Sequence, residues 1–129
     1  MKLKNRMRLF GSIFMLISIL LGAFASHYLE RFLTSESLSS FQVGIRYLTY
    51  HGLALLLFSS FDFFTDREKK IFSTLIILGS ILFSGSIFIL SFKSVLTFSV
   101  ATLGPVTPLG GGILILGWCY SVLCFLKRT

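Results

Sequence analysis

Residues 71–92 read IFSTLIILGSILFSGSIFILSF, which is 22 consecutive residues without a charged side chain. A helix needs about 20 predominantly apolar residues to cross the hydrocarbon core of a bilayer. This stretch therefore predicts a membrane-spanning helix, and the rest of the fold depends on how many similar stretches flank it.

The composition also favours a lipid environment. The chain has 129 residues, of which 54% are hydrophobic and 13% charged, whereas soluble domains carry about 25% charged residues. Its 15 phenylalanines exceed what a soluble core of this size could hide, because small domains leave much of their surface exposed. The net charge of +7 lies in short clusters between apolar runs, as membrane proteins require. We therefore expect a lipid bilayer, and no nucleic acid, as partner.

Three further apolar stretches accompany the first. Residues 9–26 carry no charge, residues 41–61 are interrupted only by Arg46 and His51, and residues 94–126 are uncharged but too long for one span. The segment GPVTP at 104–108 divides the last stretch, since prolines and glycine favour a loop or a helix end. The sequence thus predicts an all-α, four-helix transmembrane bundle forming a single domain (1–129), with helices at roughly 8–27, 41–62, 71–92 and 107–126.

Two boundaries leave alternatives open. Residues 94–106 could form a short interfacial piece, a re-entrant piece or a loop, while Pro108 suits the first turn of the fourth helix, where its missing N–H costs nothing. The basic start followed by AFAS at 23–26 also resembles a secretory signal peptide. The 18 uncharged residues at 9–26 are longer than a usual signal core, so a retained helix is favoured.

Basic residues predict the orientation. The N-terminus, the segment 62–70 and the C-terminal tail hold nine Lys and Arg residues, as 4, 3 and 2, while the opposite side holds only Arg31 and Lys93. The positive-inside rule then places both termini in the cytoplasm, as four helices require. We expect a multi-pass protein of the cell membrane.

Four blocks in a fixed order carry a family resemblance: GAFASHYLERF at 22–32, YLTYHGLALLL at 47–57, LFSGSIFILSF at 82–92 and TPLGGGILILGW at 107–118. Together they resemble the YgdD/YwdK family of small bacterial inner-membrane proteins, which has a eukaryotic transmembrane relative. The resemblance implies a four-helix membrane protein and no established activity. It places the patterned positions at Gly22, His27, Tyr47, Tyr50, His51, Ser84, Gly85, Ser86, Thr107, Pro108, Gly110 and Gly111. The family pattern has glutamines where this chain has Arg46 and Leu48.

The polar residues of the second span are the main functional candidates. Arg46 lies about 7–8 Å inside the start of the span, close enough to extend its charge to the interface. It could contact a lipid phosphate, or simply snorkel towards an acidic residue of the outer loop. His51 lies about 15 Å in, near the middle of the membrane, so we expect it uncharged and facing the bundle interior. It could be chemically active or could hold helices together by a hydrogen bond.

Other candidates carry weaker signals. Tyr47 precedes His51 by one helical turn and could bond to it; Tyr50 lies beside them, and His27 at the end of the first span is either a pH-sensitive surface group or a cap. Small residues mark expected helix contacts. These include Ser18, Gly22 and Ser26, the pair Ser80 and Ser84, and the positions Gly85, Ser86, Pro108, Gly110 and Gly111.

No catalytic set, cofactor motif or metal-ligand set is recognisable. TPLGGG lacks the Lys-Ser/Thr of a phosphate loop, the two histidines are too few and too far apart in depth for a metal, and Cys119 and Cys124 point to different faces of a helix. We therefore expect no enzyme. The first hypothesis is a structural or accessory membrane protein, with a second copy or another membrane protein as possible partner. The alternative is an oligomeric transporter or channel subunit for a small solute that uses the polar face of the second helix, and a weaker third is an enzyme acting on lipid or quinone.

Overall fold

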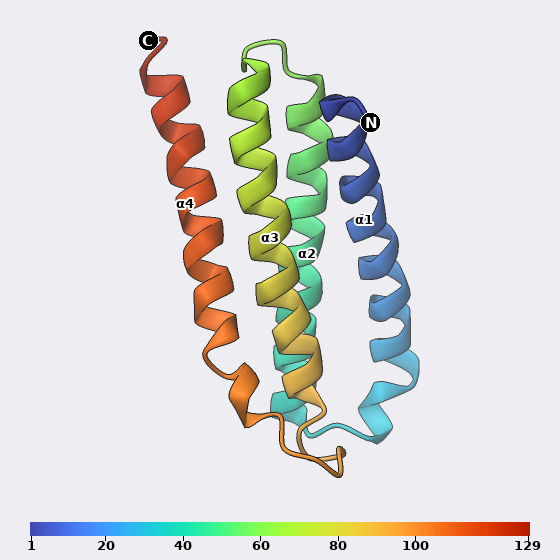
Figure 1. The fold of residues 1–129 in the computed structure, drawn as a ribbon. Helices are drawn as coiled ribbons and strands as arrows, with labels where there is room; N and C mark the ends of the chain where they lie inside the picture. Colours follow the sequence, from blue (N-terminus) through green and yellow to red (C-terminus); the bar gives the residue numbers. More distant parts are fainter.

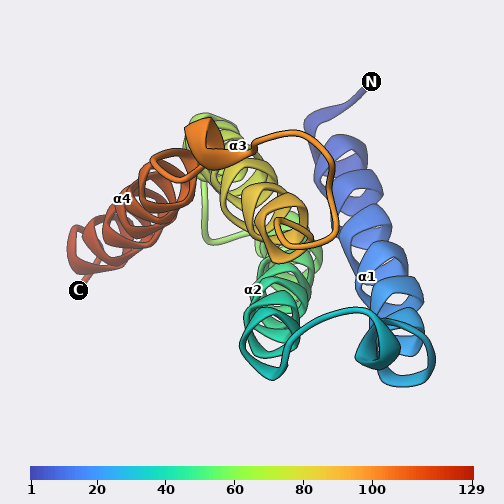
Figure 2. The ribbon, with the colours of Figure 1, turned by 90° about the horizontal axis from the view of Figure 1, so that it is seen from below.

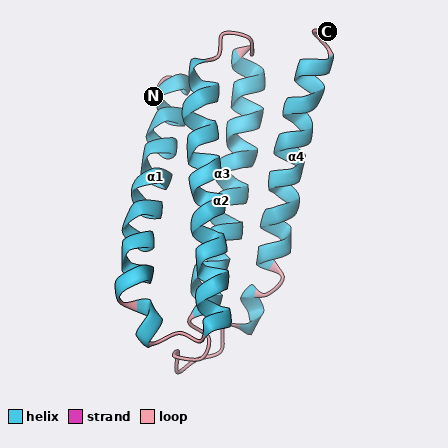
Figure 3. Ribbon diagram, turned by 180° about the vertical axis from the view of Figure 1, so that it is seen from behind, coloured by secondary structure: helices cyan, strands magenta, loops and turns pink.

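The fold consists of four long helices, described for all 129 residues by a computed structural model (Figures 1 and 3). The long helices are α1 (Leu3–His27), α2 (Ser35–Ser60), α3 (Asp66–Ser91) and α4 (Val106–Leu126), with short 3-10 helices η1 (Leu29–Arg31) and η2 (Ala101–Leu103). The expected all-α class and the number of helices are confirmed.

The first three helices begin before their apolar runs. In α2 and α3 the reason is local capping, which lets a polar turn join the helix, whereas α1 starts without a side-chain cap. Thr34 accepts a hydrogen bond from the backbone N–H of Ser37 at the start of α2. At the start of α3, Thr65 and Glu68 form a reciprocal capping box. Such caps satisfy N–H groups that otherwise lack partners, so the apolar run marks only part of α2 and of α3.

The segment between α3 and α4 is a loop at one end of the molecule, with turns and only the single 3-10 turn of η2 (Figure 1). Pro105 is the N-cap of α4, which places Pro108 at the third helical position. Pro108 is thus in the first turn, where N–H groups have no intrahelical acceptor.

The helices follow one another as an open, curved row (Figure 2). Each packs against its neighbour in sequence, and α1 also makes a smaller contact with α3. The backbone of α4 approaches only α3 and η2, so α4 forms one edge of the bundle. Both termini and the α2–α3 loop lie at the same end (Figure 1), which we call the terminal end.

Glycines allow the closest helix approaches, but not all the expected ones do so. A Cβ on Gly11 would lie 2.8 Å from the carbonyl oxygen of Gly52, and one on Gly110 would collide with the backbone of Phe83. By contrast, a Cβ on Gly22 or Gly85 would meet no atom within 4 Å. The structure therefore does not use Gly22 or Gly85 for a close backbone approach, because the space at the Cβ position of each is open.

Apolar side chains fill the space between the helices. The rings of Phe58 on α2 and Phe72 on α3 stack with centroids 4.2 Å apart, and Phe41 packs against Phe88 in the other half of the same interface, at 4.9 Å. By length and apolar composition, α1, α3 and the segment Ala101–Leu126 could each cross a membrane. The N-terminal half of α2 is more polar, but α2 lies between α1 and α3 in the row.

Candidate functional site

The most polar point inside the middle of the bundle is His51 on α2. Its side chain is only 5% exposed. The ring nitrogen Nδ1 lies 2.6 Å from the backbone carbonyl oxygen of Tyr47, one turn earlier. The other nitrogen, Nε2, accepts a hydrogen bond of 3.1 Å from the indole N–H of Trp118 on α4. The expectation that His51 faces inwards and bonds to another helix is confirmed.

These two bonds define the protonation state of the imidazole. An indole N–H can only donate and a carbonyl can only accept. Nε2 must therefore be the unprotonated nitrogen, and Nδ1 carries the proton given to Tyr47. Only the neutral ring satisfies both partners at once, as a site away from water requires. In this arrangement His51 has no free lone pair or proton for chemistry, and it acts as a link between α2 and α4.

The sequence did not identify the partner of His51. A hydrogen bond between Tyr47 and His51 was expected; it forms through the backbone carbonyl of Tyr47, whose ring stacks against the imidazole at 6.2 Å. Trp118 is the only tryptophan of the chain. An indole N–H inside a span needs an acceptor. This requirement could have predicted from the sequence that Trp118 bonds to His51, the only mid-membrane histidine.

A lateral groove lies beside this link, between α2 and α4 and over α3. Its volume is about 900 Å³, within the range of ligand pockets. Several of its walls are exposed, including Tyr50 at 56% and Ile115 at 65%. We call it the α2–α4 groove; its lining residues are Tyr47, Tyr50, His51, Phe83, Gly111, Leu114, Ile115, Trp118, Cys119, Val122 and Leu123.

Arg46 lies on a different face from His51 and is not brought to it. It is exposed and borders a shallow notch between α1 and α2, together with Gly22, Ser26 and Gln42. No carboxylate lies within ion-pairing distance of its guanidinium. His27 is the exposed last residue of α1, at the opposite end from the termini. The candidate polar residues therefore do not form one cluster.

Hydroxyl groups link helices elsewhere in the bundle. Ser84 on α3 donates to the carbonyl oxygen of Gly44 on α2 at 2.8 Å. Ser86 on α3 and Thr107 on α4 share a hydrogen bond of 2.6 Å. The resemblance pointed to Ser84, Ser86 and Thr107, and the structure places all three between helices. They bond locally and do not form a continuous polar path across the bundle.

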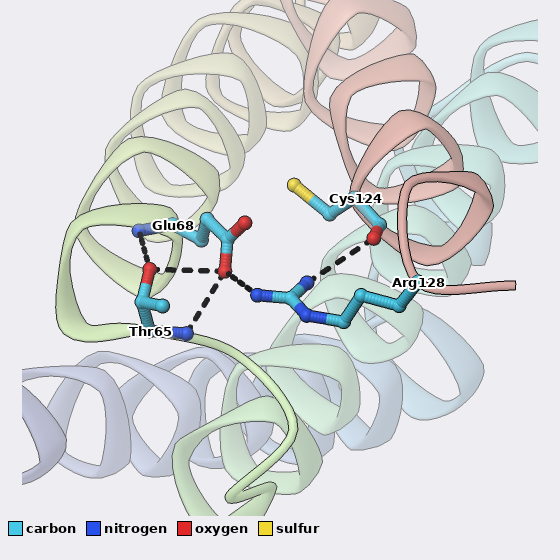
Figure 4. Close-up of polar contacts among 4 residues, drawn as sticks. All are labelled: Thr65, Glu68, Cys124 and Arg128. Atoms are coloured by element: carbon cyan, nitrogen blue, oxygen red, sulfur yellow. Dashed lines mark hydrogen bonds and ion pairs between the residues drawn. The ribbon is translucent and has the colours of Figure 1, made fainter.

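At the terminal end, α3 and α4 are joined by an ion pair (Figure 4). Arg128 donates to the carboxylate of Glu68 at 2.6 Å and also to the carbonyl oxygen of Cys124 at 3.1 Å. The same carboxylate oxygen accepts from the backbone N–H of Thr65 at 2.9 Å. The Arg128 bond, followed by the Thr65 bond, lowers the pKa of Glu68 to about 2. Glu68 is thus charged over the physiological range.

Comparison with known proteins identifies relatives over most of the chain. Residues 21–111 match the family described as Protein of unknown function (DUF423). The UPF0382 membrane protein YwdK of Bacillus subtilis is 34% identical over 122 residues, which cover 91% of this chain and 93% of YwdK. A UPF0382 membrane protein of Staphylococcus aureus is 35% identical over 91% of this chain and 92% of its own length.

A more distant organism also has a similar protein. A UPF0382 membrane protein of the fission yeast Schizosaccharomyces pombe is 35% identical over 104 residues, or 80% of this chain and 86% of the yeast protein. No solved structure matches the chain significantly. The expected resemblance to YwdK and to a eukaryotic relative is confirmed.

Proposed function

This chain belongs to the DUF423 family of membrane proteins, and we propose that it is an accessory protein that packs against an apolar helix of another membrane protein. The observation that carries the proposal is the α2–α4 groove. On one side of it, the backbone of α4 approaches only α3 and η2, so the groove offers a place for one more helix.

The lining of the groove has the spacing of a helix-packing surface. Gly111, Ile115, Trp118 and Val122 repeat at intervals of four, three and four residues along α4. Such a stripe is typical of surfaces where one helix lies in the apolar groove of another, and it extends for about 17 Å at 1.5 Å per residue. Gly111 adds a small residue that permits close approach. The bonding of His51 supports a packing role rather than catalysis at this depth.

Site-specific crosslinking tests this proposal. A photoreactive residue replacing Ile115 or Val122 should link to the same helix of one identified membrane protein, and Gly111→Leu should reduce both links by filling the groove. The matched control is Ile19 on α1, which is equally exposed at 65% but lies outside the groove. Equal crosslinking from Ile19, or links to lipid alone from Ile115, would refute the proposal.

We also propose that the protein is a multi-pass protein of the cell membrane with both termini in the cytoplasm. The support is the gathering of both termini and the α2–α3 loop at one end (Figure 1), together with the nine-to-two distribution of basic residues. Reporter fusions at Thr129 and near Ser37 should give cytoplasmic and external signals respectively. The reverse pattern would overturn this orientation.

A second candidate function is an oligomeric subunit that conducts a small solute. The exposed face of α2 carries Gln42, Arg46 and Tyr50 at helical spacing, and ionisable residues in spans usually face a protein interior or a water-filled cavity. Several copies could place this face around a common axis. Native mass spectrometry in nanodiscs should then show a defined oligomer, and Arg46→Gln should alter flux into liposomes. A monomer without flux would exclude this candidate.

A further inference from the structure

A second pocket lies at the terminal end, between the start of α1 and the start of α3. Its volume is about 520 Å³, and its lining residues are Met1, Leu3, Arg6, Asp66, Arg67 and Lys70. Three lining side chains are cations and one is an anion, so the lining side chains carry a net positive charge. We call it the basic pocket.

The cations of this pocket form no ion pair with a carboxylate of the protein. The ion pairs of the chain are Lys4 with Asp62 and Arg128 with Glu68, and neither involves a residue of the pocket. Arg6 bonds only to neutral hydroxyls, at 3.2 Å to Ser73 and 3.4 Å to Thr74. Its Nε is buried without any partner. A buried donor on a charged group is costly when unsatisfied, so the chain lacks an acceptor here.

A further cation lies next to the pocket. Lys69 is 2% exposed and forms no side-chain hydrogen bond or ion pair. It lies one turn before Ser73, the residue to which Arg6 bonds, on the same face of α3. The positive end of the α3 dipole lies at the same place. These groups together create a positive field that a bound anion would neutralise.

The position of the pocket indicates which anion fits. The apolar run of α3 begins at Ile71, directly after Lys70, so the pocket lies where a lipid head group meets the hydrocarbon. Met1 and Leu3 supply apolar walls beside the cations, which a free phosphate would not use. Basic pockets between spanning helices are suited to anionic head groups.

We propose that the basic pocket binds the phosphate of an anionic phospholipid. Arg6 supplies the positive charge of a partly buried guanidinium, and Arg67 and Lys70 supply donors at the rim. A zwitterionic lipid would bring its own cation against this positive lining and would bind less well. The proposal does not depend on the occupant of the α2–α4 groove.

The test is thermal unfolding of the full chain in detergent during titration with phosphatidylglycerol. A ligand that binds the folded state raises the unfolding temperature. Arg67→Gln and Lys70→Gln should each increase the lipid concentration needed for the half-maximal shift by about fivefold, because a basic residue near an anionic surface contributes about that factor. Both residues are exposed, so these variants should fold. Lys127→Gln is the control, with the same charge change outside the pocket.

Arg6→Gln should have a larger effect than either rim variant, provided that it folds. Phosphatidylcholine and inorganic phosphate at the same concentration should give little shift. If inorganic phosphate raises the unfolding temperature equally, the pocket binds a free anion and not a lipid. If phosphatidylcholine raises it equally, binding does not require a net negative charge on the lipid. If Lys127→Gln weakens binding as much as Lys70→Gln, the attraction is diffuse and the pocket is not a site. Each of these three results would overturn the proposal.

Discussion

The two edge helices, α1 and α4, are held to the bundle in different ways. α1 contacts two long helices, α2 and α3, and its side-chain hydrogen bonds to the rest of the bundle come only from Lys4, Arg6 and Arg8 at the terminal end. α4 has one long neighbour along its backbone, α3. Its polar links occur at three depths, through Thr107, Trp118 and the adjoining Arg128.

The difference shows how a helix with a single neighbour keeps its alignment in lipid. Apolar contact gives little preference for protein over lipid tails, so packing detail and hydrogen bonds decide helix association. α1 fits against two helices and uses a glycine-to-glycine contact. α4 could pivot on α3, and the link from Trp118 to His51 on α2 prevents this. Substitutions at these points should separate the two modes of attachment.

The largest effect is expected at the α3–α4 contact, from Gly110→Ala. The added methyl group would collide with the backbone of Phe83, which cannot move as a side chain can. We expect a loss of about 1–3 kcal/mol, the usual cost of overpacking, measured as reversible unfolding in detergent. Gly85→Ala is the matched control, since its methyl group meets nothing and should be neutral or slightly stabilising through helix propensity. Equal stability of the two variants would contradict the close approach of Gly110 to Phe83.

A smaller effect is expected at the α1–α2 contact, from Gly11→Ala. The new Cβ would lie 2.8 Å from both the Gly52 carbonyl oxygen and the Cγ atom of Leu56. Because this backbone approach is less close than that of Gly110 to Phe83, we expect a loss towards the lower end of the same range, about 1 kcal/mol. Gly22→Ala on the same helix should not destabilise. A greater loss from Gly22→Ala would show that α1 packs through its other face.

A modest effect is expected from Trp118→Phe, which removes the indole N–H and leaves Nε2 of His51 without a donor. Hydrogen bonds between spanning helices contribute about 0.6 kcal/mol on average. A double-mutant cycle with His51→Leu should therefore give a coupling energy of that order. Additive effects of the two substitutions would mean that the ring pair contributes packing but no hydrogen bond.

The smallest effect is expected at the partly exposed Glu68–Arg128 ion pair and should depend on pH. The folded-state pKa of Glu68 is lowered from 4.5 to about 2. Its contribution is therefore fully present above about pH 4.5 and is lost as the pH falls towards 2. The difference in unfolding temperature between the wild type and Glu68→Gln should shrink over this interval. A difference that stays constant between pH 5 and pH 2 would show that the pair does not form.

The sequence determined the parts of this protein that depend on local chemistry. Uncharged runs such as residues 71–92 define helices, and the prolines at 105 and 108 mark the start of α4. The inward direction of His51 also followed from the sequence, because a mid-membrane imidazole needs a polar partner within the protein. These inferences require only the composition of a segment and its depth.

Tertiary structure alone decided which residues meet. Gly22 and Gly11 lie on the same helix, yet only Gly11 is in contact, because the direction in which α1 faces α2 is a property of packing and not of composition. The pairing of His51 with Trp118 joins helices separated by α3 in the chain. The basic pocket likewise unites the first residues with those of α3. Such sites depend on the rotation and stagger of whole helices, which no short stretch of sequence specifies.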